Sequence, residues 1–123
     1  MYVATANGHV VALDATNGHL AWDTITADVR AGETLTVAPL VVKNMVIVGS
    51  SGGEYGVRGH IDALNLDNGQ RVWRFYTVPK PGERNGDTWG NGSWERGGGT
   101  AWVTGTYDPE LDTLYWSTVL LGY

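Results

Sequence analysis

The sequence predicts an all-β protein made of short antiparallel strands. No stretch holds a 3.6-residue apolar period, so we expect almost no helix. Short Val-rich runs alternate instead with turns such as Asn7-Gly8, which suit hairpins because Asn and Gly both tolerate a positive φ. The chain also carries 18 Gly, 6 Trp and 6 Tyr among its 123 residues. So many aromatic side chains exclude a disordered polar chain, because they supply apolar surface for a core.

Composition and charge exclude several classes of partner. Eight Lys and Arg stand against 13 Asp and Glu, which gives a net charge of −5, and no basic cluster is present. We therefore expect no nucleic acid partner and no attraction to an anionic membrane surface. No apolar run approaches the ~18 residues of a membrane-spanning helix, and no export signal is visible, so we expect membrane association only through regions outside this chain. The lack of cysteine excludes disulfides and thiolate chemistry.

The expected strands follow one another as hairpins separated by turns that contain Gly or Asn. In the first half of the chain we expect strands over 2–13 folded at Asn7-Gly8, a turn over 14–18, a strand over 19–22 and a hairpin over 36–49 folded at Lys43-Asn44. In the second half we expect strands over 60–66 and 70–77 about the turn 67–69, a long irregular loop over 79–99 and a last hairpin over 101–118. The acidic run of Asp108, Glu110 and Asp112 folds that hairpin, and we interpret it as turn chemistry rather than an acid–base pair.

An internal repeat narrows the architecture. Residues 12–22 align without gaps onto residues 63–73, with Ala, Leu, Asn, Gly and Trp in common. Repeats of about this spacing are typical of β-propeller blades, whereas the alternative is a β-sandwich with coincidental turns. A single blade cannot bury both of its faces, so a Trp of the outermost strand can pack on the next blade where a turn Gly leaves room. We therefore predict β-propeller blades, with repeat units near 1–22 and 36–73.

The repeat unit resembles the tryptophan-docking motif of the quinoprotein alcohol dehydrogenases, which are eight-bladed propellers that use pyrroloquinoline quinone (PQQ). Residues 51–59 are similar to the stretch of that family that carries quinone contacts and a calcium ligand. Residues 97–102, followed by 107–112, resemble the segment whose tryptophan forms the floor of the quinone pocket. The motifs cover essentially the whole chain in the order of the family. Because the family enzymes are several times longer, the resemblance implies a partial β-propeller of about two blades, with residues 1–123 as a fragment of a single PQQ-binding domain.

The resemblance implies a set of quinone-binding residues. They are Thr36, Ser51, Gly52, Gly53, Thr100 and Trp102. Hydroxyl and unobstructed backbone N–H groups suit a carboxylate-bearing cofactor, although paired glycines also mark ordinary β-bulges. A flat indole can stack on a tricyclic quinone, and Trp102 lies outside the docking repeat that assigns Trp22 and Trp73 to the core.

Glu54 is the metal ligand that the resemblance implies. A carboxylate on flexible, Gly-rich backbone can close on a hard cation such as Ca²⁺, and the choice between calcium and a lanthanide stays open. The family carries a Gly-Asn pair whose asparagine is a second metal ligand, and this sequence has Val119-Leu120 at that place. Because leucine cannot coordinate a cation, we expect the metal site within this chain to be incomplete.

The remaining charged residues receive structural interpretations. We expect Arg58 to pair with a neighbouring carboxylate rather than to contact a cofactor. The three histidines, His9, His19 and His60, show no metal-ligand spacing, so we expect them at surface or edge positions.

The function implied is PQQ- and calcium-dependent oxidation of a primary alcohol to an aldehyde. The resemblance further implies a small alcohol substrate, a cytochrome c electron acceptor and a periplasmic location. No catalytic residue is assigned within this chain, because the catalytic aspartate of the family is expected outside it, and the chain alone is expected to be inactive. The alternative is a non-catalytic propeller scaffold or assembly protein with docking repeats, which would not need the segments around Ser51 and Trp102.

Overall fold

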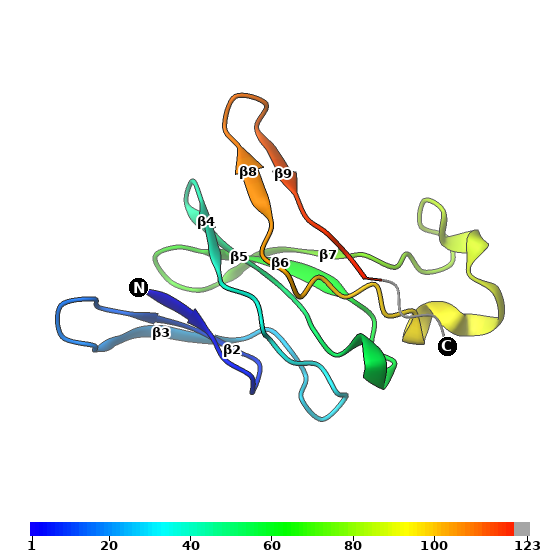
Figure 1. The fold of residues 1–123 in the computed structure, drawn as a ribbon, viewed down its shortest axis with the longest axis horizontal. Coiled ribbons are helices and arrows are strands. Elements are labelled where there is room, and N and C mark those ends of the chain that lie inside the picture. The colour runs from blue at the N-terminus through cyan, green and yellow to red at the C-terminus, as the bar shows by residue number, and fades with distance from the viewer. Residues whose placement is uncertain (120–123) are drawn as a thin grey trace.

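The computed structural model describes residues 1–119, whose strands form three antiparallel sheets (Figure 1). The first sheet contains β1 (Tyr2–Ala4), β2 (His9–Leu13) and β3 (Leu20–Ile25). The second contains β4 (Leu40–Val42), β5 (Met45–Gly49), β6 (His60–Asn65) and β7 (Arg71–Tyr76). The third is the hairpin of β8 (Thr106–Asp108) and β9 (Thr113–Tyr115). The second sheet, with four antiparallel strands in chain order, has the arrangement of one propeller blade.

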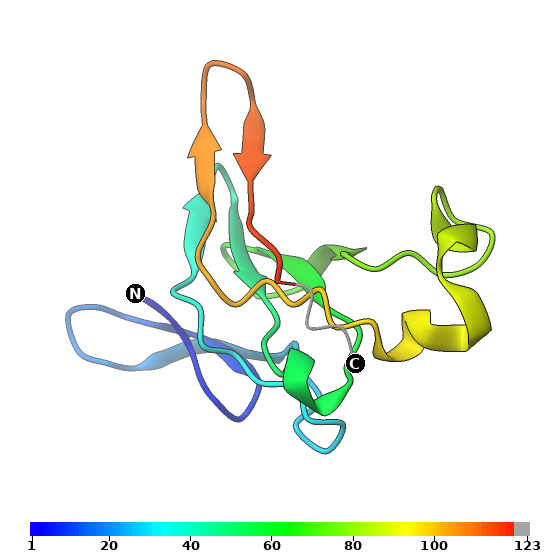
Figure 2. The ribbon, with the colours of Figure 1, turned by 45° about the vertical axis from the view of Figure 1, so that its right-hand side comes forward.

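Helical structure is sparse, as the lack of a helical period predicts. The described residues contain three short 3-10 helices and no α-helix: η1 (Gly53–Tyr55), η2 (Gly86–Thr88) and η3 (Gly90–Arg96). The last two lie in the loop expected over 79–99, which projects from the sheets (Figure 2) and is thus partly ordered rather than wholly irregular. Over residues 1–119, no helix has the length and apolar character needed to cross a membrane.

The internal repeat corresponds to one turn built twice. The Gly18 amide donates to the Asp14 carbonyl at 2.8 Å, and the Gly69 amide donates to the Asn65 carbonyl at 2.9 Å. The side-chain oxygens of Asp14 and Asn65 each accept the backbone N–H two residues further on. Gly18 and Gly69 have φ angles of 76° and 71°, a left-handed conformation that favours glycine. The equal hydrogen bonds show that the sequence repeat is a structural repeat.

Trp22 of the first sheet packs on the second copy of that turn. Its Nε1 donates to the Leu66 carbonyl at 3.0 Å, and Thr24 Oγ1 donates to the Gly69 carbonyl at 2.8 Å. A Cβ at Gly69 would lie 2.5 Å from a carbon of the Trp22 ring. The tryptophan therefore docks where the turn glycine leaves room, as the repeat predicts.

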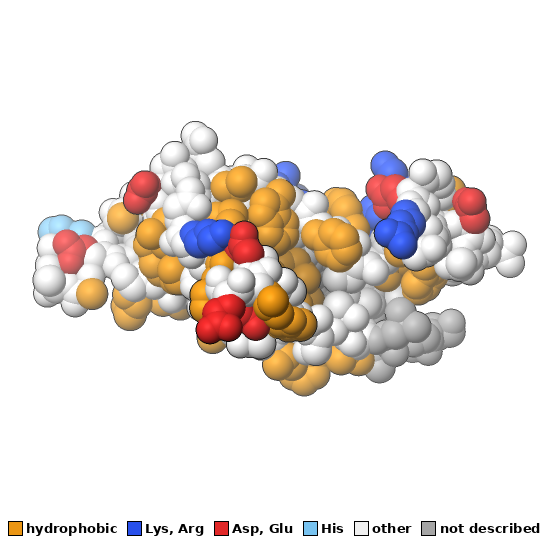
Figure 3. Space-filling view, turned by 90° about the horizontal axis from the view of Figure 1, so that it is seen from above, with side chains coloured by type: hydrophobic (Ala, Val, Ile, Leu, Met, Phe, Trp, Pro, Cys, Tyr) orange, Lys and Arg blue, Asp and Glu red, His pale blue; other side chains and the backbone are white. Residues whose placement is uncertain are grey.

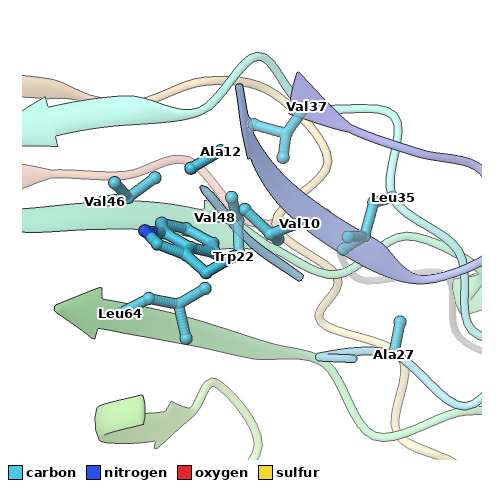
Figure 4. Close-up of a cluster of buried hydrophobic side chains, with 9 residues drawn as sticks. All are labelled: Val10, Ala12, Trp22, Ala27, Leu35, Val37, Val46, Val48 and Leu64. Atoms are coloured by element: carbon cyan, nitrogen blue, oxygen red, sulfur yellow. The ribbon is translucent and has the colours of Figure 1, made fainter. Parts of the chain in front are cut away.

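The main core lies between the first two sheets, with the Trp22 ring at its centre (Figure 4). Its buried residues are Val10, Ala12, Trp22, Ala27, Leu35, Val37, Val46, Val48 and Leu64. The core takes alternate residues from β2, Val10 and Ala12, and from β5, Val46 and Val48. Ile47, which lies between the two β5 residues, belongs to a second cluster on the other face of the sheet. One face of the first sheet and one face of the second sheet thus bury each other.

The two copies of the turn allow the contribution of the Trp22–Gly69 contact to the free energy of unfolding to be measured. We expect Gly69→Ala to lower the free energy of unfolding by about 1–2 kcal/mol for the left-handed backbone and by a further ~1–3 kcal/mol for the clash with Trp22. Gly18→Ala carries the same backbone penalty, but its Cβ would meet nothing within 4 Å. Urea denaturation of both variants separates the two costs. Equal losses in the two variants would contradict the docking contact.

The third sheet is joined to the second by a smaller core. Trp116 donates from Nε1 to the Ala101 carbonyl at 3.0 Å and packs beside both apolar clusters. At the tips of the two hairpins, the exposed side chains of Lys43 and Asp112 form an ion pair with 2.7 Å between Nζ and Oδ1. The Asp108 carboxylate accepts the Glu110 amide at 2.9 Å, so this acidic run does fold the turn. Hydrophobic side chains stay exposed across the middle of the face seen in Figure 3.

A buried polar network ties the first sheet to the second. Arg74 binds both carboxylate oxygens of Asp62, at 2.7 and 2.6 Å, and also donates to the Thr26 carbonyl at 2.7 Å. Asp62 is 0 % exposed. Burial alone would lower the pKa of Arg74, but the hydrogen bonds to Asp62 outweigh burial and raise it. Arg74 therefore stays protonated, and its hydrogen bonds connect β6 and β7 to the end of β3.

His60 belongs to the same network, and the expectation of a surface or edge position is wrong for this residue. It is 1 % exposed, and its Nε2 lies 3.0 Å from the Thr26 carbonyl, to which it donates. Burial lowers the pKa of His60, and the charge of Arg74 adds to that effect. A neutral ring follows near neutral pH. His19 is exposed, as expected, whereas His9 is half-buried at the start of β2, the central strand of its sheet, where it lies 2.7 Å from Asp23.

Candidate functional site

Three separate segments of the chain meet at the predicted site. Ser51 follows β5, Thr36 precedes β4, and Trp102 precedes β8. The Ser51 amide donates to the Thr34 carbonyl at 2.8 Å, which joins the first two segments. The Ala101 amide donates to the Ser50 carbonyl at 2.9 Å, which joins the third. Backbone hydrogen bonds therefore fix residues that are far apart in sequence.

The three segments enclose a cavity of about 390 Å³. Its wall is formed by Thr34, Thr36, Ser51, Gly52, Glu54, Thr100, Trp102 and Val119. This volume lies within the usual range of small-molecule sites. The structure thus brings together every residue that the resemblance singled out, except Gly53.

Hydroxyl groups give one side of the cavity its polarity. Thr36 Oγ1 and Ser51 Oγ lie 2.7 Å apart and share a hydrogen bond. Thr36 Oγ1 also lies 3.5 Å from the Trp102 carbonyl oxygen, a long contact that spans two of the three segments. Ser51 and Thr100 are buried, at 6 % and 2 % exposure. Hydroxyls held in this way can donate to or accept from a polar ligand at fixed positions.

The two glycines of this segment serve different contacts. Gly52 has a φ of 103°, and a Cβ there would lie 2.1 Å from the Gly32 carbonyl oxygen. A Cβ at Gly53 would lie 3.0 Å from Thr100 Oγ1. Both glycines therefore permit close packing of neighbouring segments, and Gly53 lies behind the cavity wall rather than on it.

Trp102 differs from the tryptophans of the core. It is 48 % exposed, whereas Trp22 is 8 % exposed. It lies on the cavity wall and follows three glycines, of which Gly98 and Gly99 have φ angles of 64° and 62°. Trp73 is partly buried and packs beside the second core cluster. The Trp102 ring is thus available to a flat ligand in a way that the Trp22 ring is not.

Glu54 is the acidic residue on the described part of the cavity wall. It lies in η1, between Gly52 and Gly56, which both adopt the left-handed conformation at the ends of that short helix. Within residues 1–119, no group of three or more His, Cys, Asp or Glu side chains is placed to hold a metal ion. One carboxylate at the cavity can contribute to a cation site but does not form one by itself.

Sequence reasoning missed Thr34 and Val119. Thr34 lies two residues before Thr36 in extended backbone, and that spacing places both side chains on one face, so the pattern could have identified it. Val119 donates its amide to the Thr100 carbonyl at 3.0 Å and brings an apolar side chain to the cavity. The expected substitution of a metal ligand at Leu120 lies outside the described residues.

Arg58 anchors the long loop beside the site. It donates to the Val78 carbonyl at 2.7 Å and pairs with Glu83 at 3.1 Å, as the expected carboxylate partner. The guanidinium also lies 3.9 Å from the centre of the Tyr76 ring and 5.0 Å from that of Trp94. The backbone amide of Lys80 and the charge of Arg58 lower the pKa of Glu83. Arg58 therefore holds the loop and does not line the cavity.

Comparison with known proteins identifies close relatives. The family described as glucose/ethanol/alcohol dehydrogenase, β-propeller domain (PQQ) matches residues 23–120. Lanthanide-dependent methanol dehydrogenase of Methylacidiphilum fumariolicum (strain SolV) is 42 % identical over 137 residues, covering 96 % of this chain and 22 % of that protein. Methanol dehydrogenase (cytochrome c) subunit 1 of Paracoccus denitrificans is 38 % identical over 130 residues, covering 91 % of this chain and 21 % of that protein.

A solved structure shows the same arrangement of strands. A europium-containing methanol dehydrogenase superposes with a TM-score of 0.89 and 40 % identity, over 97 % of this chain and 24 % of that one. The sheets are therefore part of a β-propeller of that type. The chain spans about a fifth of the length of the relatives it matches.

Proposed function

Because the chain belongs to the PQQ family of glucose, ethanol and alcohol dehydrogenase β-propeller domains, we propose that it supplies one side of the quinone site of an enzyme that oxidises a primary alcohol to an aldehyde. The observation that supports this most strongly is the convergence of Thr36, Ser51, Thr100 and Trp102 on one cavity. These residues come from three segments that are far apart in sequence. A scaffold that binds no ligand would not require polar and aromatic side chains from all three segments around one cavity.

The residues of the cavity fit the group. PQQ, when bound, supplies the acceptor for the hydride of the alcohol. The hydroxyls of Thr36 and Ser51, already 2.7 Å apart, would bind its polar rim, and Thr100 would add a buried hydroxyl. The Trp102 ring would cover one face of the ring system and exclude water from it. Gly53, which lies behind the wall, would act by letting Thr100 approach.

We assign Glu54 as the ligand that this chain contributes to a metal ion beside the quinone. Its carboxylate is of the hard type that Ca²⁺ and lanthanides both prefer. Calcium is the ion implied by the family resemblance, and the lanthanide and europium named for two relatives support the alternative. Val119 lines the cavity without a side-chain donor atom, and the described wall holds no second carboxylate, so any further carboxylate ligand would come from outside the described residues.

The relatives and the family resemblance support an electron acceptor, a substrate class and a location for the whole enzyme. A relative named for cytochrome c supports a cytochrome as electron acceptor, and the family resemblance supports a small alcohol substrate and a periplasmic location. We further propose that residues 1–123 belong to a single propeller domain. The described cavity wall holds no carboxylate besides Glu54, so this chain alone is expected not to oxidise alcohols.

Quinone binding tests this proposal. We expect PQQ with Ca²⁺ to quench the tryptophan fluorescence of the chain in a saturable way. Trp102→Leu should weaken binding about tenfold, because a stacking partner of ~1.4 kcal/mol is lost. Trp73→Leu also leaves five tryptophans but changes a residue away from the cavity, so it should bind like the wild type. If a complete propeller that contains these residues shows no saturable quenching with calcium or a lanthanide, the non-catalytic scaffold becomes the better interpretation, because this chain supplies only one side of the proposed site.

A further inference from the structure

Thr77 lies directly after β7, outside the cavity, and contacts the backbone of two segments that form the cavity wall. Its Oγ1 lies 2.5 Å from the Gly99 carbonyl oxygen and 3.0 Å from the Gly59 carbonyl oxygen. Its own amide donates to the Gly59 carbonyl at 3.0 Å. A hydroxyl has one proton, which the shorter distance directs to Gly99. Thr77 therefore holds two segments that are 40 residues apart in sequence: its amide binds Gly59 and its hydroxyl binds Gly99.

The two held segments are those that lead to the cavity. Gly59 is the last residue of segment 51–59, which contains Ser51 and Glu54. Gly99 immediately precedes Thr100. Besides the contact with Thr77, the Gly59 amide donates to the Gly98 carbonyl at 2.7 Å, and the Gly98 amide donates to the Val57 carbonyl at 3.0 Å. The two segments thus run side by side behind the cavity.

Close packing makes this junction sensitive to small shifts. A Cβ at Gly59 would lie 2.4 Å from the Gly99 carbonyl oxygen. A Cβ at Gly99 would lie 2.9 Å from Thr77 Oγ1, and this residue already has a left-handed φ of 62°. Gly59 and Gly99 have no side chains that could fill a gap if the two segments moved apart. The hydrogen bond from the Thr77 hydroxyl to Gly99 therefore helps to keep the segments in contact.

We propose that Thr77 is a positioning residue for the quinone site, an inference that rests on the proposed function. Its hydroxyl fixes the separation between the wall that carries Ser51 and Glu54 and the wall that carries Thr100 and Trp102. Thr77 itself lines the outer grooves of β7 and not the cavity, so it acts only through the backbone it holds.

The test compares Thr77→Val, which keeps the shape but removes the hydroxyl, with Thr77→Ser, which keeps the hydroxyl. Thr113→Val is the matched control, because Thr113 Oγ1 also donates to a carbonyl, that of Leu111 at 2.9 Å, in a hairpin away from the cavity. We expect Thr77→Val to weaken PQQ binding about tenfold at a temperature where all variants are folded. Thr77→Ser and Thr113→Val should bind within about twofold of the wild type.

Hydrogen exchange of the chain without quinone gives a second, independent measurement. The amides of Gly59 and Ala101 are both hydrogen-bonded across these segments. Thr77→Val should speed their exchange about tenfold, and the other two variants should not. Unchanged exchange, or unchanged quinone affinity in a wild type that does bind, would overturn the role of Thr77. A wild type that binds no quinone but shows the exchange difference would overturn the proposed function and leave Thr77 as the residue that holds the two segments.

Discussion

Replacement of Asp62 by alanine should lower the free energy of unfolding by about 3–5 kcal/mol. The carboxylate is fully buried and accepts two hydrogen bonds from Arg74, so its loss leaves a half-buried guanidinium without its counter-charge. Arg74 would retain the Thr26 carbonyl, which is not charged. The measurement is urea denaturation at a fixed protein concentration.

Lys43→Met is the matched control for that loss, because it removes one charge of an exposed ion pair and keeps Asp112 with its hydrogen bond from Tyr107. Asp112 also binds a cation, Lys43 at 2.7 Å, but the two side chains are 65 % and 55 % exposed. Pairs of this kind contribute at most about 1 kcal/mol, because water solvates both charges in the folded and unfolded chain. If Asp62→Ala costs no more than Lys43→Met, the buried pair does not hold the first two sheets together.

Trp22→Ala should cost a similar amount, about 3–5 kcal/mol. The ring lies at the centre of the main core, and its Nε1 donates to the Leu66 carbonyl of the next sheet. Trp22→Phe should keep much of the packing but lose that hydrogen bond, whose loss alone should lower the free energy of unfolding by about 1 kcal/mol relative to the wild type. Thermal or urea unfolding of both variants measures the two parts.

Trp73 is the natural comparison, because it occupies the same position in the repeat. It is only partly buried, and within residues 1–119 its indole N–H has no hydrogen-bond partner. Trp73→Ala should therefore cost less than half as much as Trp22→Ala. Equal costs would mean that the tryptophans stabilise their own sheets rather than the contact between sheets.

The repeat allowed much of the fold to be predicted. Local hydrogen bonds fix the two turns, so the sequence from Asp14 to Gly18 and from Asn65 to Gly69 was sufficient to identify them. Alternation and turn residues also located the hairpins to within a few residues. The ends of strands depend on their partners across the sheet, and these boundaries were less well predicted.

Contacts between distant segments escaped prediction. His60 is buried because Thr26 and Asp62 are brought to it by folding, and nothing in its neighbouring sequence shows this. The candidate quinone residues were found through their motifs, and the structure adds that Gly53 lies behind the cavity wall while Thr34 lies on it. Thr77 carries no motif, and its role is visible only from the two carbonyls that it contacts.

A crystal structure of this chain with PQQ and Ca²⁺ is the most direct measurement of the proposed site. We expect the ring system in the 390 Å³ cavity, against the Trp102 indole, with polar atoms of the cofactor within hydrogen-bond distance of Thr36 and Ser51. The metal should lie beside the Glu54 carboxylate. Quinone bound on another surface, or a cavity without quinone at a concentration that saturates fluorescence quenching, would contradict the assignment of this site.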